Sequence, residues 1–129
     1  MMNKTVLLIV AVSLLFGCNS GEKKNANEVS MTAENMVTDL QKQLIEIKTG
    51  TVIVLPEGSF EFERPLSMND VPNITIKGAG KGKTILSFKN QIEGGEGMII
   101  KAANDLTLEG FTVADSKGDG IKVQGCTNV

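Results

Sequence analysis

The sequence contains no histidine, tryptophan or tyrosine, and Arg64 is its only arginine. Histidine is the side chain most often used as a general acid or base near neutral pH, and tryptophan and tyrosine offer an apolar face with a polar group in many binding sites. An enzyme made from these residues alone would depend on carboxylates, lysines and hydroxyls. The composition therefore excludes histidine-dependent chemistry.

Cysteine is also scarce, since the chain has only Cys18 and Cys126. We assign Cys18 to lipidation below, and a lipidated thiol cannot form a disulfide, so a disulfide framework is excluded. No histidine is present to activate Cys126 as a nucleophile. We therefore predict that Cys126 is a small residue of the interior or of a turn.

The remaining composition indicates one globular domain, because the 129 residues are 41% hydrophobic and 22% charged. The formal net charge is -2, and the lysines occur singly or in short KK and KGK groups. A nucleic-acid-binding surface needs a basic stripe, so we expect no nucleic-acid partner.

The N-terminus has the pattern of an export signal. MMNK precedes TVLLIVAVSLLF, an apolar run that is short for a membrane-spanning helix and ends at Gly17 and Cys18. LLFGC resembles the lipobox of bacterial lipoproteins, in which the cysteine is lipidated and becomes the new N-terminus. The alternative is an ordinary secretory signal with an incidental Cys18, because Phe16 stands where lipoboxes usually have a small residue.

These features predict a signal peptide over residues 1–17, lipidation at Cys18 and a tether over residues 18–29. The polar string NSGEKKNANEV suits a flexible link between a lipid anchor and a folded domain. The expected location is the cell envelope, at a membrane, and the outer membrane if the source is Gram-negative.

Residues 30–50 have the periodicity of an amphipathic helix, with Ser30 or Thr32 as the expected cap at its start. Its polar face carries charges of both signs, which favours packing on a protein core over lying on a membrane surface. The apolar stripe consists of Met36, Val37, Leu40, Leu44 and Ile47.

After Gly50 the pattern changes to short strands separated by glycines. Phe60 and Phe62 alternate with Glu61 and Glu63, which places apolar and charged side chains on opposite faces of a strand. No segment of helical length interrupts the strands, and this disfavours a βαβ fold. The predicted strands are TVIVL, SFEFE, NITIK, TILSF, MIIK, DLTLE, FTV and IKV.

Two segments recur along the chain. NITIKG at residues 73–78 returns as DLTLEG at 105–110, and a third copy starts with Asn128 and Val129. EGMIIK at 96–101 returns as DGIKVQ at 119–124. The later copies of both segments follow the same 23-residue step, whereas the first step of NITIKG, from 73 to 105, is longer. We assign its extra residues, about nine, to the KNQIEGGEG region.

A repeat made only of short strands and turns cannot bury its apolar face alone, so successive repeats are expected to stack as coils of an all-β solenoid. Stacking predicts an inward column of Ile74, Leu106 and Val129 and a second of Ile76 and Leu108. It also predicts a polar corner column of Asn73, Asp105 and Asn128.

The order of the helix, TVIVLPEGSFEF, VPNITIKGAG, NDLTLEGFTV and GDGIKV resembles the opening of right-handed parallel β-helix proteins of the pectate-lyase-like superfamily. It is similar in particular to exported bacterial lipoproteins built of parallel β-helix repeats, over residues 33–129. The resemblance implies that the helix over 30–50 caps one end of a single-stranded β-helix formed by residues 51–129. Since a third repeat begins at Asn128, we expect this chain to be the front of a longer β-helix.

Two glycine-rich motifs are rejected as ligand sites. GAGKGKT at residues 78–84 ends like a phosphate-binding loop, but Lys77 stands where the first glycine is required and a strand follows in place of a helix. GGEGMIIK resembles a calcium-binding β-roll repeat, but Ile99 occupies the aspartate position. We expect no nucleotide, no metal and no other cofactor.

The weak ligand candidates are Asp115, Lys117, Asp119 and Lys122, which surround a glycine-rich turn. Relatives that act on acidic polysaccharides use aspartates, calcium and basic residues on the outer face of the β-helix, so the resemblance implies such a role. The alternative is that turns select Asp and Gly for backbone reasons, and Asp119 aligns with Glu96 in the repeat. We favour the turn interpretation and assign no catalytic residue.

Two functions follow as hypotheses. The first is a lipid-anchored carbohydrate-binding or scaffold module of the cell envelope. The alternative is the N-terminal part of a polysaccharide lyase, hydrolase or uronate epimerase whose catalytic coils lie outside these residues.

Overall fold

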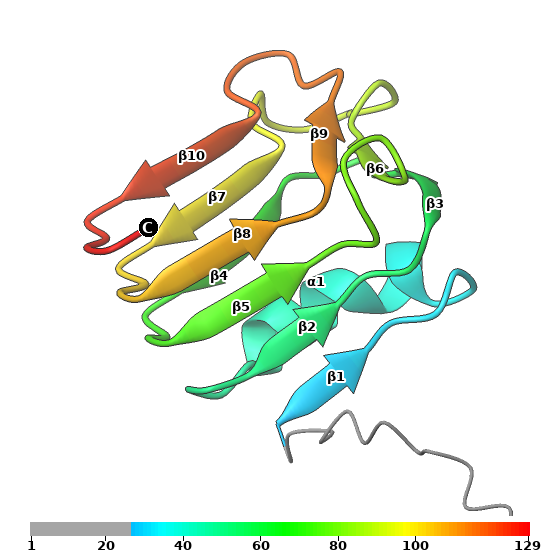
Figure 1. The fold of residues 1–129 in the computed structure, drawn as a ribbon. Helices are drawn as coiled ribbons and strands as arrows, with labels where there is room; N and C mark the ends of the chain where they lie inside the picture. The colour runs from blue at the N-terminus through cyan, green and yellow to red at the C-terminus, as the bar shows by residue number, and fades with distance from the viewer. Residues whose placement is uncertain (1–26) are drawn as a thin grey trace, which may run out of the picture.

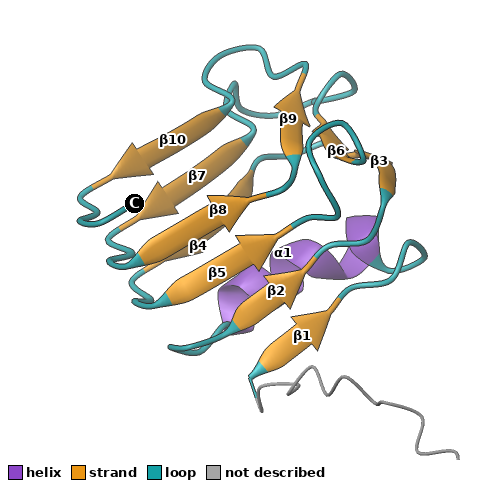
Figure 2. Cartoon of the chain, viewed as in Figure 1, coloured by secondary structure: helices purple, strands orange, loops and turns teal. Residues whose placement is uncertain are grey.

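A computed structural model describes residues 27–129, in which the chain passes through three sheets in turn (Figure 1). Figure 2 shows the helix beside the stacked strands. The elements are β1 (Glu28–Ser30), α1 (Met36–Glu46), β2 (Val52–Val54), β3 (Gly58–Glu61), β4 (Leu66–Asn69), β5 (Ile74–Lys77), β6 (Thr84–Ser87), β7 (Met98–Lys101), β8 (Leu106–Glu109), β9 (Thr112–Ala114) and β10 (Ile121–Gln124).

Every strand pairing is parallel. The three sheets have the orders β1-β2-β5-β8, β3-β6-β9 and β4-β7-β10, so each strand lies beside its counterpart from the previous round of the chain. Parallel strands in stacked sheets with one helix are compatible with the predicted β-helix class. Strands β1 and β4 were not among the predicted strands.

The apolar core runs along the interior of the stack. Ile53 and Ile76 pair across β2 and β5, and both are fully buried. The rings of Phe62 and Phe88 stack with centroids 5.6 Å apart at the corner that follows β3 and β6. Full burial of a side chain of this size contributes about 1.5–3 kcal/mol, so these columns are the main source of stability.

The strand registers confirm the 23-residue step. They place part of the nine-residue insertion outside the segment predicted for it. Met98 pairs with Ile121, whereas Ile74 pairs with Leu106 and Ile85 with Thr112. The difference in residue number between paired positions therefore falls from 32 at β5–β8 to 27 at β6–β9 and to 23 at β7–β10. Five of the extra residues lie between β5 and β6 and four between β6 and β7, so assigning all nine to KNQIEGGEG was wrong in part.

The helix lies inside the predicted range 30–50 but is shorter. Asn35 is its N-cap residue, and its Oδ1 accepts a hydrogen bond from the backbone N–H of Thr32 at 2.8 Å, while Ser30 belongs to β1. Met36, Leu40 and Leu44 are buried, as the predicted stripe requires. Val37 is 49% exposed, so its place in that stripe was wrong.

The structure bears on the N-terminal boundaries only from Asn27 onward. Strand β1 pairs with β2, with Val29 opposite Ile53, so the end of the predicted tether 18–29 is part of a sheet. The predicted signal peptide 1–17 and Cys18 lie outside the described residues. Within residues 27–129 no helix is long and apolar enough to cross a membrane.

The predicted corner column is confirmed. Asn73, Asp105 and Asn128 have φ values of 57°, 55° and 57°, a left-handed conformation that Asn and Asp tolerate better than most residues. Asn128 Nδ2 donates a hydrogen bond to Asp105 Oδ1 at 2.7 Å. All three side chains thus suit the turn, and the hydrogen bond between Asp105 and Asn128 also joins successive rounds.

The inward column of Ile74, Leu106 and Val129 is correct for its first two members only. Ile74 and Leu106 are buried, whereas Val129 is 64% exposed. Ile121 and Val123, which pair with buried residues of β7, are each 40% exposed. The exposure arises because no residue within 27–129 covers this face of the last round.

Candidate functional site

One corner of the stack carries a continuous set of polar side chains at the ends of β3, β6 and β9. Lys89 Nζ lies 2.6 Å from Glu61 Oε1, and Asn90 Nδ2 donates a hydrogen bond to Glu61 Oε2 at 2.5 Å. Ser87, which is buried, donates from Oγ to Asp115 Oδ2 at 3.1 Å. We call Glu61, Ser87, Lys89, Asn90 and Asp115 the polar row.

Lys89 is the central cation of the polar row. Its hydrogen bond to the Glu61 carboxylate, and then the charge of that carboxylate, raise the pKa of the Lys89 ammonium, and Asp115 adds to this effect. A raised pKa keeps the ammonium charged at neutral pH. Lys89 is thus suited to donate hydrogen bonds to an oxygen-rich ligand and not to accept a proton.

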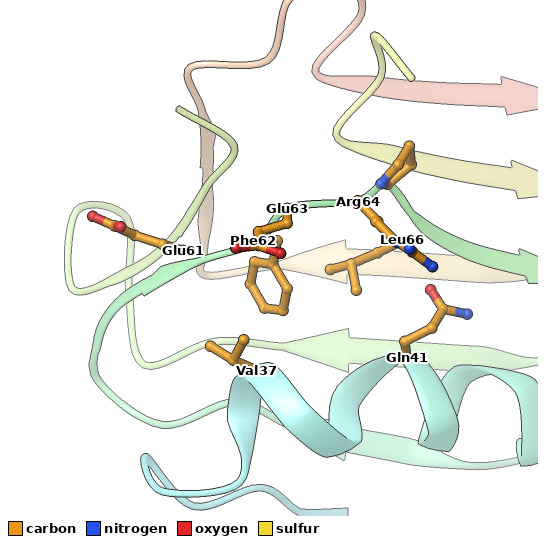
Figure 3. Close-up of a pocket in the computed structure, with 8 residues that line it drawn as sticks. Val37, Gln41, Glu61, Phe62, Glu63, Arg64 and Leu66 are labelled. Carbon is orange, nitrogen blue, oxygen red and sulfur yellow. The ribbon is translucent and has the colours of Figure 1, made fainter. Parts of the chain in front are cut away.

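A pocket of about 290 Å³ lies next to the polar row, between helix α1 and the segment that follows β3 (Figure 3). In this view the Phe62 ring and the Leu66 side chain point toward α1, whereas the Glu61 carboxylate points away. Glu61 therefore connects the two features, since its side chain belongs to the polar row. The lining residues are Val37, Gln41, Glu61, Phe62, Glu63, Arg64, Pro65 and Leu66.

The backbone of β3 is open on the side away from β6. Gly58 N–H bonds to Lys83 O and Phe62 N–H to Ser87 O, and in a parallel ladder the intervening residues point the other way. Ser59 and Glu61 therefore direct their N–H and C=O groups away from β6, and no residue within 27–129 forms a backbone hydrogen bond with them there. Unpaired strand backbone is available to a ligand.

Arg64 is the one guanidinium at the pocket. Its Nε lies 3.5 Å from Glu93 Oε2, and both side chains are largely exposed. An exposed ion pair of this kind adds little stability, so Arg64 is not held in place by it. The sequence singles out Arg64 only as the sole arginine, because its position at a pocket depends on the packing of α1.

The four weak ligand candidates have different partners. Asp115 belongs to the polar row, and Lys122 Nζ lies 3.1 Å from Glu96 Oε1. Lys117 and Asp119 are exposed, and among the described residues no hydrogen bond or ion pair joins any two of the four.

The ion pair of Glu96 and Lys122 changes the pKa of its carboxyl group. The hydrogen bond from Lys122 lowers the pKa of the Glu96 carboxyl, and the backbone amides of Glu96 and Gly95 lower it further. This pair lies between stacked turns, since Gly118 N–H donates to Gly95 O at 2.6 Å. The pair therefore belongs to the contacts between turns of successive rounds.

Cys126 is half-buried against the core, and its Sγ accepts a hydrogen bond from Ala103 N–H at 3.2 Å. This agrees with the prediction of a small residue near a turn.

Within residues 27–129, no group of three or more His, Cys, Asp or Glu side chains is placed to hold a metal ion.

Comparisons of this chain with protein-family models, with curated protein sequences and with solved structures find no significant match. The case for a function therefore rests on the polar row and the adjoining pocket.

Proposed function

We propose that this chain is an exported, lipid-anchored protein of the cell envelope that acts as a carbohydrate-binding or scaffold module. In this proposal its parallel strands form a right-handed β-helix of the pectate-lyase-like kind, and α1 caps one end of it. The buried residues Met36, Leu40 and Leu44 support a capping role, because they bring the apolar face of α1 into the core.

The polar row is the observation that carries the binding proposal. It follows the ends of three adjacent strands of one sheet, from Glu61 through Lys89 to Asp115, and Glu61 also lines the adjoining pocket. Neighbouring strands are about 4.8 Å apart, so the row extends about 10 Å along the stack. A linear polymer with many hydroxyls can contact donors and acceptors from several rounds at once.

Binding is tested by affinity electrophoresis of the protein through gels that contain neutral or uronate-rich polysaccharides, with and without calcium. We expect retardation by at least one polysaccharide, and weaker retardation for the double variant Lys89→Met with Asp115→Asn. The matched control is Lys77→Met with Glu109→Gln, which removes the same charges from another sheet. Equal retardation of both double variants would reject the polar row as the binding surface.

The same polysaccharides decide between binding and catalysis. A binding module leaves the number of reducing ends and the absorbance of unsaturated products constant. If this chain alone raises the number of reducing ends or this absorbance, the enzyme alternative replaces the binding proposal.

The anchor is tested separately by mass spectrometry and membrane fractionation. We expect Cys18 at the mature N-terminus with an added lipid mass, and release from the membrane fraction in Cys18→Ser. An unmodified Cys18 in the mature protein would refute lipidation.

A further inference from the structure

We infer that the pocket beside α1 is a subsite for one neutral, hydroxyl-rich sugar ring. The inference rests on the proposed carbohydrate-binding function and adds the position and the chemical class of the bound unit. It depends on the shape of the pocket, its unpaired polar groups and its charge.

The shape of the pocket suits a single ring. Its volume of about 290 Å³ lies at the lower end of the range for small-molecule sites. Val37, which is 49% exposed, gives it an apolar side, and the buried core residues Phe62 and Leu66 also line it. The C–H face of a pyranose can pack on such a surface while its hydroxyls point outward. This also accounts for an apolar helix residue that the core leaves exposed.

The polar side of the pocket offers both donors and acceptors. Glu61 contributes the backbone N–H and C=O that β6 leaves free. The Glu63 carboxylate forms no hydrogen bond with residues 27–129, and Arg64 uses Nε toward Glu93, which leaves its terminal nitrogens for a ligand. A carboxylate accepts from two hydroxyls and a guanidinium donates to two, so adjacent hydroxyls of a sugar fit this set.

The charge of the site favours a neutral sugar over a uronate. The Glu61 carboxylate points away and is paired with Lys89, which leaves Glu63 and Glu93 against Arg64 beside the pocket. A uronate carboxylate would add a further negative charge to this excess, and like charges at short range disfavour binding.

An extended peptide is the other ligand that an open strand edge attracts. Only Ser59 and Glu61 present free backbone groups along β3, and Pro65 has no N–H. Strand addition gains affinity from a longer row of backbone hydrogen bonds. The short edge beside a ring-sized pocket therefore favours the sugar.

The test is an NMR titration of the full ¹⁵N-labelled chain in detergent micelles. The probes are the methyl glycosides of glucose, galactose and mannose, compared with sodium glucuronate, sodium galacturonate and a short extended peptide. We expect at least one neutral glycoside to shift the amide signals of Val37, Glu61, Phe62 and Arg64, and the uronates to shift them less.

Three variants separate geometry from charge. We expect Glu63→Gln to weaken the binding of the neutral glycoside by about fivefold or more, because hydrogen bonds to charged groups are the stronger ones. Arg64→Lys keeps the charge but loses the two-pronged donor, so a comparable loss is expected. Glu109→Gln removes a carboxylate from another sheet and should leave the affinity unchanged.

Several results would overturn the subsite, and the first two differ in whether the proposed function stands. If polysaccharides bind but the glycosides shift only signals of the polar row, the subsite is wrong and the proposed function stands. If no saccharide binds anywhere, both are wrong. Stronger shifts with a uronate, or with an extended peptide instead of a sugar, also overturn the neutral-sugar assignment.

Discussion

The side-chain amide of Gln41 pairs with the backbone of Ser67 as a neighbouring strand would. Ser67 N–H donates to Gln41 Oε1 at 2.8 Å, and Gln41 Nε2 donates to Ser67 O at 3.1 Å. Ser67 lies in β4, the edge strand of its sheet beside α1. One glutamine on the helix thus satisfies a donor and an acceptor of the strand edge.

Replacing Gln41 by Met keeps the size of the side chain and leaves both Ser67 backbone groups without a protein partner. We expect a loss of about 1–2 kcal/mol in the free energy of unfolding, measured by urea titration, because an unsatisfied, partly buried group costs its desolvation. Gln43→Met on the same helix is the control, since Gln43 has no side-chain hydrogen bond to residues 27–129. Equal losses in the two variants would show that the pairing contributes nothing.

Gly78 is required by a close approach between rounds. A Cβ added at Gly78 would clash with the carbonyl oxygen of Gly110 and would lie 2.8 Å from Phe111 Cβ, so the backbone would have to move. We expect Gly78→Ala to lower the free energy of unfolding by about 3 kcal/mol or more. Gly120→Ala is the control, because its nearest neighbour, Val113 Cγ1, is 3.9 Å away. Thermal unfolding of the pair measures the difference, and similar midpoints would contradict the close approach.

The pairing of β7 with β10 and the corner column of Asn73, Asp105 and Asn128 were predictable because they repeat. A residue that recurs one step later along the chain occupies the same place in the next round, and strand stacking then sets its partner. Such relationships depend only on order along the chain. They can therefore be predicted from the sequence without any structural information.

Features that occur once were missed. Strand β4 follows Pro65 and alternates buried Leu66 and Met68 with polar Ser67, a pattern too short and too polar to stand out from a turn. Only its place in the round, with Leu66 opposite Met98 of β7, marks it as a strand. Strand β1 is similar, since its single pairing with β2 gives no repeat to detect.

The site was the least predictable part. Glu61 and Lys89 come from successive rounds, and the ion pair between them depends on how the extra residues are divided between two loops. The pocket depends on α1, whose Val37 is 49% exposed although its spacing suits the apolar stripe. Neither fact follows from local periodicity, because both arise from packing between segments that are far apart in the sequence.

The stack of Phe62 and Phe88 supports the corner beneath the polar row. Phe88 is fully buried, and Phe88→Ala is expected to cost about 3–5 kcal/mol in urea unfolding, from lost burial and the cavity left behind. Ile92→Ala, in the same loop but largely exposed, should change stability by less than about 0.5 kcal/mol. A small loss at Phe88 would mean that the corner is not closely packed.

The ion pair of Glu96 and Lys122 predicts a specific pH dependence of stability. Lys122 and two backbone amides lower the pKa of Glu96 below its ordinary value of 4.5, so the folded state favours the ionised carboxyl. The resulting stabilisation is fully present above pH 4.5 and is lost as the pH falls through the lowered pKa of the folded state. The difference in free energy of unfolding between the parent chain and Glu96→Gln should therefore be constant near neutral pH and shrink in acid. In a chain that already carries Lys122→Met, most of this difference should disappear, whereas in a chain that carries Glu109→Gln it should remain. A difference that persists unchanged in strong acid would reject the ion pair as its cause.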